Sequence, residues 1–467
     1  MKLFKFNLAI IIIGFFSCSC FADIVNDKTQ LNPIIVEKIV IPESIEEISN
    51  LVAHHSGPIS IAGGQYSQGG QTAIENGLFL DMKNMNHIIN LDLEKNQITV
   101  EAGTTWIQIL EKVDPEGLSP KIMQSFYNFT VGGSISVNVH GRYVGEGAII
   151  RSVESIKIIL ADGSVKEASR VKNPELFFGA IGGYGGIGII VEVTLNLAQN
   201  ITLDRVSKRM SIEKYKDYFS NNIKNSKTAI LHNADIYPPN YTQVNAITWN
   251  KTNKSLTIKE KLSLQNEISP FKKFLLTLVS NGDFRKFLRQ YFYDPYKYYD
   301  HMVAWRNYEA GDDVSVLEPL AQDKSIFLLQ EYFIPVENFN SFVPKMINIL
   351  KQHQVNVFNI SVRHALPDSE SLLSWAQKEV FAFVIYYEQG KSEAEKKDVY
   401  QWTSKLIDAA LEESGSYYLP YQIIATLDQF LRAYPRSEQY FDLKKLVDPT
   451  YKFKNKLLER YYPAPGL

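Results

Sequence analysis

Cysteine is nearly absent from this sequence, and both copies lie at one end. The 467 residues include only Cys18 and Cys20, within the first 22 positions. Two lysines, an apolar run and small residues give that stretch the pattern of a secretory signal peptide, with a lipoprotein leader or an uncleaved membrane anchor as the alternatives. A mature chain that begins at Asp23 contains no cysteine. We therefore expect no disulfide, no thiolate metal site and no cysteine nucleophile.

A dominant charge is lacking as well. Lysine and arginine together number 49 and aspartate and glutamate 51, which gives a formal net charge of -2. Without a basic field we expect no nucleic-acid partner. Beyond the leader, no run reaches the ~18 apolar residues that a membrane span needs. We expect an exported protein, in the periplasm or secreted, that is either free or associated with a membrane surface.

Several catalytic signatures are missing. The eight histidines show no HExxH spacing, so we expect no metal site. The sequence contains no GxSxG nucleophile elbow, and its glycine loops carry no Walker lysine. These absences argue against zinc proteases, serine hydrolases of the elbow type and P-loop nucleotidases.

Glycine is concentrated in the first 200 residues, and this divides the chain. The sequence is too long for one core, since chains split into domains beyond roughly 250 to 300 residues. The glycine-rich part has the pattern of short strands and turns, and longer helical patterns begin near residue 201. We expect a leader, two domains and a terminal segment, at residues 1–22, 23–200, 201–429 and 430–467.

Three glycine-rich stretches stand out in the first domain: AGGQYSQGGQ, TVGGSISVNVHG and GGYGGIGII. The third contains Gly183, Gly185 and Gly188 in a GxGxxG spacing. A Rossmann motif needs a strand before it and a helix after it, whereas a helical pattern precedes this one and a strand pattern follows. We therefore reject a Rossmann fold. Glycines joined to strands predict instead that backbone amides line a concavity for an anion such as pyrophosphate.

The glycine stretches belong to a longer series of motifs. They occur in order with TVEAGTTWIQIL, VESIKIILADGSV and NPELFFGA between residues 33 and 200. This series resembles the PCMH-type FAD-binding domain of the vanillyl-alcohol oxidase superfamily. Fainter similarity in FLLQEYFIPVENF, ISVRHALPD, GSYYLPYQ and DPTYKFKNKLLERYY points to its sugar-, polyol- and aldonolactone-oxidising branch, which includes the alditol and decaprenylphosphoryl-ribose oxidases.

The resemblance implies an α+β fold and a bound FAD. Residues 23–200 would form a PCMH-type FAD-binding domain of two α+β subdomains, and residues 201–429 a substrate-binding cap with an antiparallel sheet and helices on one face. The segment 430–467 would return to the FAD-binding domain.

The resemblance also implies which residues bind FAD. The first glycine loop would surround the pyrophosphate, a strand from Val137 to His140 would run beneath the isoalloxazine ring, and Ile189 or Ile190 would touch the adenine side. The full set is Ala62, Gly63, Gly64, Gln65, Tyr66, Ser67, Gln68, Gly69, Gly70, Gln71, Ser125, Thr130, Val131, Gly132, Gly133, Val137, Asn138, Val139, His140, Ile189, Ile190 and Tyr418.

Two departures from the family pattern bear on the chemistry. Many relatives attach the flavin covalently to a histidine in the first glycine loop, where this sequence has Gln65 or Tyr66, so we expect non-covalent FAD. The ribose-oxidising relatives carry an active-site lysine two strand residues beyond the counterpart of Tyr418, on the same face. The aligned position in this sequence is Tyr421. The substrate of those enzymes therefore cannot be assumed for this protein.

Five residues are the candidates for catalysis: His140, Glu331, Arg363, Tyr418 and Tyr421. Oxidation of an alcohol at a flavin needs hydride transfer to N5 and a group that takes the hydroxyl proton. Glu331 and Arg363 lie in apolar strand patterns, where their pKa values are open to perturbation; the alternative is a structural ion pair. His140 is either a flavin-facing residue or a core histidine. His364, next to Arg363, would point to the opposite face of a strand.

We expect an FAD-dependent oxidoreductase that oxidises a CH–OH group of a sugar, polyol, aldonolactone or lipid-linked sugar. The resemblance implies that Val139 borders the flavin edge that oxygen approaches, where a small residue goes with oxidase activity. The bulk of valine therefore favours a dehydrogenase that passes electrons to a quinone or another carrier, over an oxidase that uses oxygen. Residues 271–299 mix basic and aromatic side chains at helical spacing, which indicates a helix with an apolar core face and a solvated face, or a surface for a membrane or lipid-linked substrate. The alternative function is a catalytically inactive flavin-binding or scaffold protein of the cell envelope.

Overall fold

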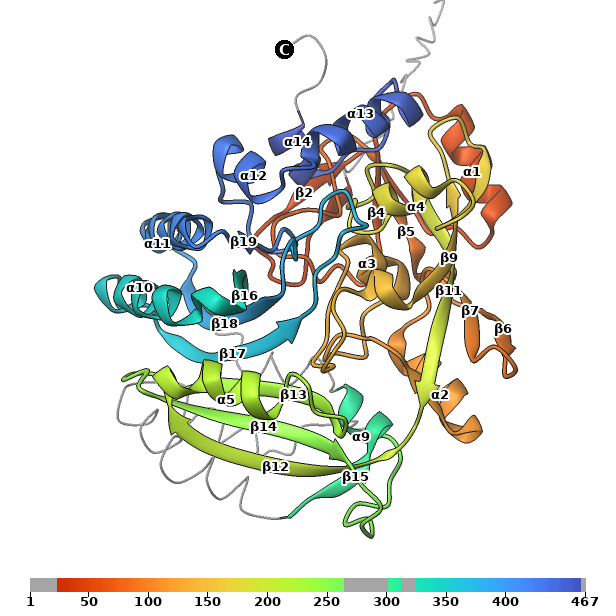
Figure 1. Ribbon diagram of the computed structural model, residues 1–467. Coiled ribbons are helices and arrows are strands. Elements are labelled where there is room, and N and C mark those ends of the chain that lie inside the picture. Colours follow the sequence, from red (N-terminus) through yellow and green to blue (C-terminus); the bar gives the residue numbers. More distant parts are fainter. Residues whose placement is uncertain (1–22, 264–300, 312–324, 463–467) are drawn as a thin grey trace, which may run out of the picture.

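The computed structural model describes residues 23–263, 301–311 and 325–462. The expected signal peptide, residues 1–22, and the basic and aromatic stretch 271–299 lie outside the described residues. Figure 1 shows the N-terminal part of the chain on one side, a large sheet on the other, and C-terminal helices lying across the top of the view. No helix among the described residues is long and apolar enough to cross a membrane.

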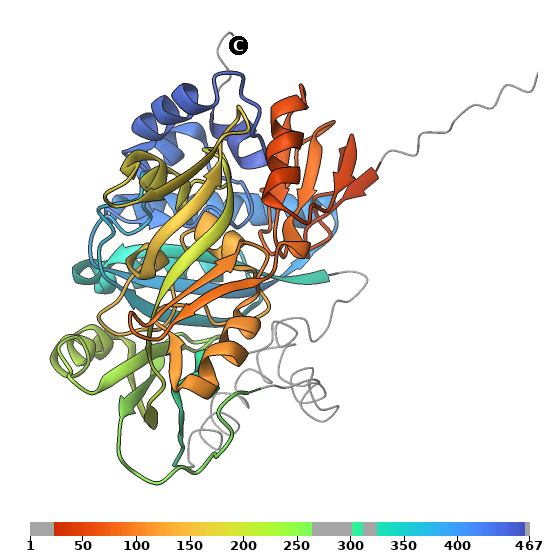
Figure 2. The same ribbon diagram turned by 90° about the vertical axis from the view of Figure 1, so that its right-hand side faces the viewer.

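A small parallel sheet forms the first subdomain, with the order β3-β5-β4. Helix α1 lies beside these strands (Figure 2) and starts where the Ser44 side chain accepts a hydrogen bond from the N–H of Glu47. Ile48 and Val52 of α1 are fully buried. The elements are β3 Lys38–Val40, α1 Ile45–His54, β4 Ile59–Ala62 and β5 Leu78–Asp81, with a separate hairpin of β1 Asp23–Val25 and β2 Ile34–Val36.

The second subdomain is an antiparallel sheet with the order β10-β9-β11-β7-β6, and β8 pairs with β11. The turn between β9 and β10 contains Gly163 at φ +83°, which confirms the hairpin that Asp162 and Gly163 predict. The elements are β6 Ile88–Asp92, β7 Gln97–Glu101, α2 Trp106–Val113, β8 Leu118–Pro120, α3 Val131–Ser136, β9 Val153–Ile159, β10 Val165–Ser169, α4 Pro174–Ala180 and β11 Ile189–Gln199.

The cap is one eight-stranded antiparallel sheet with the order β15-β12-β14-β13-β17-β18-β16-β19. Strand β12 starts three residues after the end of β11, so the chain passes directly from the second subdomain into the cap. The strands are β12 Thr202–Ser211, β13 Ala229–Ile236, β14 Gln243–Lys251, β15 Val303–Trp305, β16 Ser325–Pro335, β17 Val357–Ala365, β18 Val380–Gly390 and β19 Ser416–Tyr417.

Helices cover one face of the cap sheet, on the left of Figure 1. They are α5 Tyr215–Asn222, α10 Phe339–Gln352 and α11 Glu393–Glu412, and α9 Arg306–Ala310 follows β15. The ring of Phe219 on α5 lies 4.8 Å from the ring of His364, which confirms that His364 points to the helical face. Glu331 and Ser361 both pair with Val384. Because alternate residues of a strand share a face, Glu331 and Arg363 lie together on the opposite face.

The last 35 or so described residues pack against the N-terminal domain. After α12 Leu427–Ala433 and α13 Ser437–Val447, the chain runs beside β4, where the N–H of Ile59 donates to the carbonyl of Lys452 at 2.7 Å. The N–H of Lys454 returns a bond to the carbonyl of Ile59 at 3.0 Å. Helix α14, Lys456–Tyr461, follows. The whole is an α+β fold of the PCMH type, as the resemblance implied.

Candidate active site

The three glycine stretches meet between the two N-terminal sheets. A Cβ atom on Gly63 would lie 2.1 Å from Oγ1 of Thr130, so the loop after β4 packs directly against the start of α3. The N–H of Gly182, in the third stretch, donates to a carbonyl of α3 at 3.0 Å. A Cβ atom on Gly185 would lie 3.1 Å from Cδ1 of Ile61 in β4. Segments far apart in the sequence therefore form one site.

The first glycine loop offers unused hydrogen-bond donors. Within the described residues, the N–H groups of Gly63, Gly64, Gln65 and Ser67 have no hydrogen-bond partner. These residues are half-buried, and a row of unpaired amides beside glycine backbone offers donors to a bound anion. Successive N–H groups of this kind bind phosphate oxygens. The donor set fits the pyrophosphate of FAD.

The second half of the same loop has a different role. The N–H of Gln68 donates to the carbonyl of Pro420 at 2.7 Å, and the Gln71 amide donates to the carbonyls of Leu419 and Tyr421 at 2.8 and 2.6 Å. The N–H of Gly69 is taken by Oε1 of Gln71. This half therefore fastens the loop to the segment after β19. The N–H groups of Gln68 and Gly69 are thus used within the protein, and the predicted contacts of this half with FAD stay a prediction.

The predicted strand from Val137 to His140 is wrong. Residues 131–136 form the short helix α3, Val137 ends it, and Asn138 has a left-handed backbone with φ +52°. The helix forms because the Thr130 side chain accepts a hydrogen bond from the N–H of Gly133. Gly132 is needed for packing, because a Cβ there would lie 2.7 Å from Cβ of Ala102.

Asn138 is a structural anchor. Its side chain is fully buried, and its Nδ2 donates to Oδ2 of Asp368 and to Oγ of Ser371, both at 2.9 Å. Its Oδ1 accepts from the N–H of Ile150 at 3.2 Å. These bonds use the side chain's polar atoms within the protein, which leaves it little to offer to a flavin.

The remaining predicted cofactor residues differ in exposure. Ile189 and Ile190 on β11 are 0% and 7% exposed, and Ile189 packs in the core of the first subdomain with Leu80. Val139 is 6% exposed, and Ser125 is half-buried. The Tyr66 ring stacks on Phe129 at 4.2 Å between centroids. Their contacts with FAD stay predictions.

His140 and Glu331 form a buried pair between the N-terminal domain and the cap. Nε2 of His140 lies 2.5 Å from Oε1 of Glu331, and their side chains are 4% and 3% exposed. Nδ1 of His140 lies 3.2 Å from the carbonyl oxygen of Gly141. The carbonyl can only accept, so an Nδ1–H would donate to it and leave Nε2 to Glu331. The arrangement puts an imidazole and a carboxyl group, both able to carry a proton, in direct contact.

Two tyrosines complete this side of the site. The Tyr421 hydroxyl donates to Oε2 of Glu331 at 3.3 Å, and the Tyr418 hydroxyl donates to the carbonyl of Val137 at 2.8 Å. Strand β19 ends at Tyr417, so Tyr418, which the resemblance implied on a strand, lies with Tyr421 on the following turn. Burial raises the pKa of both, and the charge of Glu331 adds to the effect. Both hydroxyls therefore stay protonated donors.

Arg363 supplies a cation without a fixed partner. It lies on the same sheet face as Glu331, and its buried Nε atom has no hydrogen-bond partner among the described residues. Burial lowers the pKa of Arg363 from its ordinary value, and Glu331 opposes this. The alternative of a structural ion pair between Glu331 and Arg363 is not what the contacts show, since the ion-pair contact of Glu331 is with His140. The site thus brings together all five predicted catalytic residues, and their catalytic roles stay predictions.

Sequence reasoning missed the aromatic support of His140. The Trp375 ring lies 5.0 Å from the His140 ring and stacks on Phe333 at 4.2 Å. The Trp375 indole donates to the carbonyl of Asn138 at 2.9 Å, which fixes the turn that carries His140. Trp375 is in an irregular segment between β17 and β18, so no periodic pattern marks it. Its rarity is the only signal, since the chain has five tryptophans.

Unpaired amides at converging glycine turns, beside a buried histidine–glutamate pair and an arginine, fit an FAD-dependent oxidoreductase of the PCMH type. Comparison with known families agrees: residues 36–169 match the family described as FAD binding domain, and residues 193–461 match the D-arabinono-1,4-lactone oxidase family. The second match covers more than half of the chain. The protein therefore belongs to the D-arabinono-1,4-lactone oxidase family.

Individual relatives are distant. L-gulonolactone oxidase of Mus musculus is 22% identical over 440 residues, which cover 90% of this chain and 94% of the relative. L-gulonolactone oxidase of Bos taurus is 26% identical over 216 residues, 46% of this chain and 48% of the relative. Cytokinin dehydrogenase 2 of Arabidopsis thaliana is 29% identical over 190 residues, 39% of this chain and 36% of the relative. The last two matches span less than half of the relative's length.

Proposed function

We propose that this protein uses FAD to oxidise a CH–OH group of an aldonolactone, sugar or polyol. The observation that carries the proposal is the cluster of His140, Glu331, Tyr421 and Arg363 beside the glycine turns. When bound, the flavin supplies a hydride acceptor at N5. The protein's own task is then to hold the alcohol and to accept its proton. A scaffold without catalysis is not favoured, because it does not account for a buried proton-handling pair.

Glu331 and His140 form the proposed proton acceptor. A substrate hydroxyl in hydrogen-bond reach of Glu331 can release its proton into the pair as hydride leaves the same carbon. Tyr421 keeps the Glu331 carboxylate in position through Oε2. Trp375 and Phe333 pack around the His140 ring, which excludes water from the pair.

Arg363 is proposed to bind substrate oxygen. A guanidinium with an unpaired Nε presents N–H donors to a hydroxyl or a lactone carbonyl. Its positive charge also stabilises the alkoxide character that develops as the hydroxyl proton leaves. The names of the matched family and of the gulonolactone oxidases support an aldonolactone as the first substrate to test.

The electron acceptor is proposed to be a quinone or another carrier rather than oxygen. The support is the bulk of Val139, next to His140 and buried to 6% exposure. Relatives include proteins named as oxidases and as dehydrogenases, so both acceptors need testing. We also propose that FAD is not covalently attached, because Gln65 and Tyr66 take the place of a histidine in the first loop.

We further propose export to the periplasm or outside the cell, on the pattern of residues 1–22. A lipid-linked sugar substrate and a membrane contact rest on residues 271–299 alone, and they rank below a soluble lactone or polyol. The export proposal is tested by N-terminal sequencing of the protein isolated from its native cell, where a start at Asp23 is expected.

Purified protein tests the function directly. We expect bound FAD that is released by acid precipitation and is bleached under nitrogen by an aldonolactone or polyol. A dye or quinone should then reoxidise the flavin faster than air does. Protein that stays colourless with excess FAD would refute the proposal. Protein that binds FAD, but is not bleached by any lactone, sugar or polyol, would support the inactive scaffold instead.

A further inference from the structure

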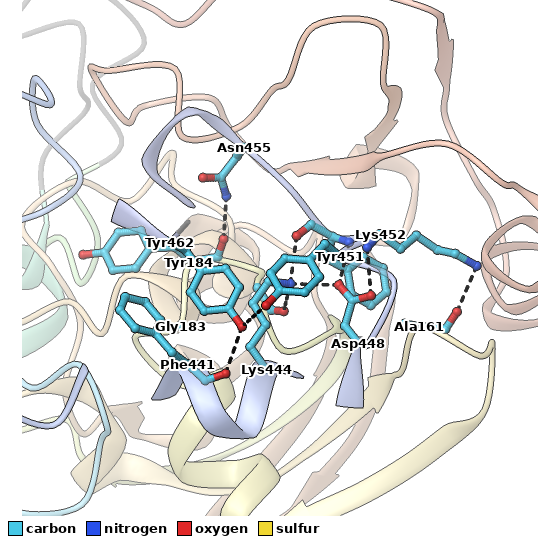
Figure 3. Close-up of polar contacts among 12 residues, drawn as sticks. Ala161, Gly183, Tyr184, Phe441, Lys444, Asp448, Tyr451, Lys452, Asn455 and Tyr462 are labelled. Atoms are coloured by element: carbon cyan, nitrogen blue, oxygen red, sulfur yellow. Dashed lines mark hydrogen bonds and ion pairs between the residues drawn. The ribbon is translucent and has the colours of Figure 1, made fainter. Parts of the chain in front are cut away.

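Side chains of the C-terminal segment hold the third glycine turn by its carbonyl groups. The Tyr440 hydroxyl donates to the carbonyl of Gly183 at 2.7 Å, and Nζ of Lys444 donates to the carbonyl of Gly186 at 2.8 Å. Nδ2 of Asn455 donates to the carbonyl of Tyr184 at 2.8 Å. Figure 3 shows Lys444, Asn455 and the backbone they contact. We call Tyr440, Lys444 and Asn455 the C-terminal clasp.

Lys444 is buried and fully bonded. Its side chain is 1% exposed, and that of Asp448 is 0% exposed. The three hydrogens of the ammonium group go to Gly186, to Oδ2 of Asp448 at 2.8 Å and to the carbonyl of Phe453 at 3.0 Å. A buried ion pair adds little net stability compared with apolar side chains of similar size. Its presence against a glycine turn therefore calls for a role beyond packing.

The clasp fixes the direction of two N–H groups. In a planar trans peptide the C=O and the N–H point opposite ways. Asn455 holds the carbonyl of Tyr184, so the N–H of Gly185 points away from the clasp. Lys444 holds the carbonyl of Gly186, so the N–H of Ile187 also points away. Among the described residues neither N–H has a hydrogen-bond partner.

The turn does not keep this shape by local preference alone. Gly182, Tyr184 and Gly185 all have a left-handed backbone, with φ of +77°, +52° and +74°. For a tyrosine this conformation is strained and persists only where the surroundings enforce it. The N–H of Tyr184 is tied to the carbonyl of Ser136 at 2.9 Å, and the clasp ties its carbonyl. Figure 3 shows the Tyr184 ring directed away from Lys444 and Asp448.

We propose that the C-terminal clasp positions residues for FAD: by holding the carbonyls of Tyr184 and Gly186, it turns the N–H groups of Gly185 and Ile187 toward the dinucleotide, while Tyr440 fixes the start of the turn through the carbonyl of Gly183. The turn lies against Ile61 at the end of β4, where the unpaired amides of the first glycine loop begin. The two sets of donors then form one cradle from both sides. This inference rests on the proposed placement of FAD at the glycine turns. It assigns Lys444, Tyr440 and Asn455 no contact with FAD itself.

FAD affinity of the apoprotein tests the inference without any turnover. FAD is removed from the full chain, and its Kd is measured by fluorescence titration for Lys444→Met, Tyr440→Phe and a control, Tyr461→Phe. Tyr461 lies in the same segment, is 2% exposed and donates to the carbonyl of Ala425 at 3.0 Å, away from the turn. We expect Kd to rise about tenfold or more for Lys444→Met and about fivefold for Tyr440→Phe. The control should keep the wild-type Kd.

A second readout separates positioning from loss of stability. Hydrogen exchange of residues 183–187 should slow when FAD binds the wild type, and this protection should be reduced in both clasp variants at saturating FAD. The unfolding temperature of each apoprotein shows whether a clasp variant is as stable as the control. Clasp variants that bind FAD as the control does would overturn the inference and leave the proposed function standing. Wild-type apoprotein that does not bind FAD would overturn both. If Lys444→Met does not fold, the Kd and the exchange protection of Tyr440→Phe test the inference in its place.

Discussion

The Nε2 atom of His140 lies 2.5 Å from Oε1 of Glu331, although the two residues are 191 positions apart in the sequence. One follows the short helix α3 of the N-terminal domain and the other is in strand β16 of the cap. Their contact joins the two domains at the point where the glycine turns converge. A proton between these atoms is therefore held where the cofactor and the substrate are expected to meet.

Removal of the Glu331 charge should stop turnover without releasing FAD. For Glu331→Gln we expect kcat to fall about 10²- to 10⁴-fold, because an amide cannot accept the substrate proton. The matched control is Glu379→Gln, since Glu379 also contacts a histidine, His364, at 2.8 Å. The control should keep kcat and lose some stability. Equal loss of kcat in both variants would contradict the role of Glu331.

Replacement of Arg363 should weaken substrate binding and slow the chemistry. For Arg363→Met we expect kcat/KM to fall about 10- to 100-fold, because a charged hydrogen bond to the substrate is lost. Arg363→Lys retains the charge but not the shape of the donor group, so its kcat/KM should lie between the values of the wild type and the Met variant. Steady-state kinetics with one lactone and one polyol measure both. A Lys variant no better than the Met variant would show that geometry, and not charge, governs this contact.

A smaller residue at Val139 should admit oxygen. For Val139→Ala we expect reoxidation of the reduced flavin by air to speed up about tenfold, which is about 1.4 kcal/mol in the barrier. Stopped-flow absorbance of the reduced protein mixed with oxygenated buffer measures this rate. Val153→Ala, at a fully buried position of β9, controls for a cavity made elsewhere. An unchanged oxygen rate in Val139→Ala would remove the support for a dehydrogenase.

Acid should destabilise the cap through His232. Its ring is buried between the Tyr215 hydroxyl and Oγ1 of Thr248, and burial lowers the pKa of His232 from 6.5 to about 3. The unfolded chain then binds a proton that the folded one does not, so stability falls as the pH drops below 6.5. We expect a loss of about 2 kcal/mol by pH 5 from this group.

Thermal or urea unfolding between pH 7 and 5 measures the effect. His232→Gln should be less stable at pH 7 but show a shallower decline toward pH 5. Glu379 does not confound this range, because its pKa is lowered to about 2, mainly by the hydrogen bond from His364, and its contribution is lost only below pH 4.5. Burial raises the pKa of Asp27, so the comparison with His232→Gln, which leaves Asp27 unchanged, isolates the histidine. Parallel pH profiles for wild type and variant would show that His232 is not the source.

Many local features followed from the sequence because their causes are local. Asp162 with Gly163 turns the β9/β10 hairpin, since such a turn needs only a few neighbouring residues. The alternation in ISVRHALP placed Arg363 and His364 on opposite faces. The order of the glycine motifs indicated the cofactor class through resemblance to a family.

Other features could not be read locally. The glycines of the second stretch serve close packing in helix α3, because Ala102 lies against Gly132. The polar atoms of the Asn138 side chain are used by Asp368, Ser371 and Ile150, which no pattern near Asn138 announces. The resemblance predicted a strand from Val137 to His140. The structure has a helix and a turn in this region, because Thr130 caps a helix that contains Gly132 and Gly133.

The sequence by itself indicated the glycine-rich cofactor-binding part, because backbone freedom at glycine is a property of short segments, and the order of its motifs indicated the family and with it a sheet-based cap. Only the tertiary structure decided which groups face one another. It joined His140 to Glu331, Gln71 to Leu419 and Lys444 to Gly186, pairs separated by 191, 348 and 258 positions. Such pairs form because buried polar groups must find partners once the chain is compact, and compaction selects those partners by position in space.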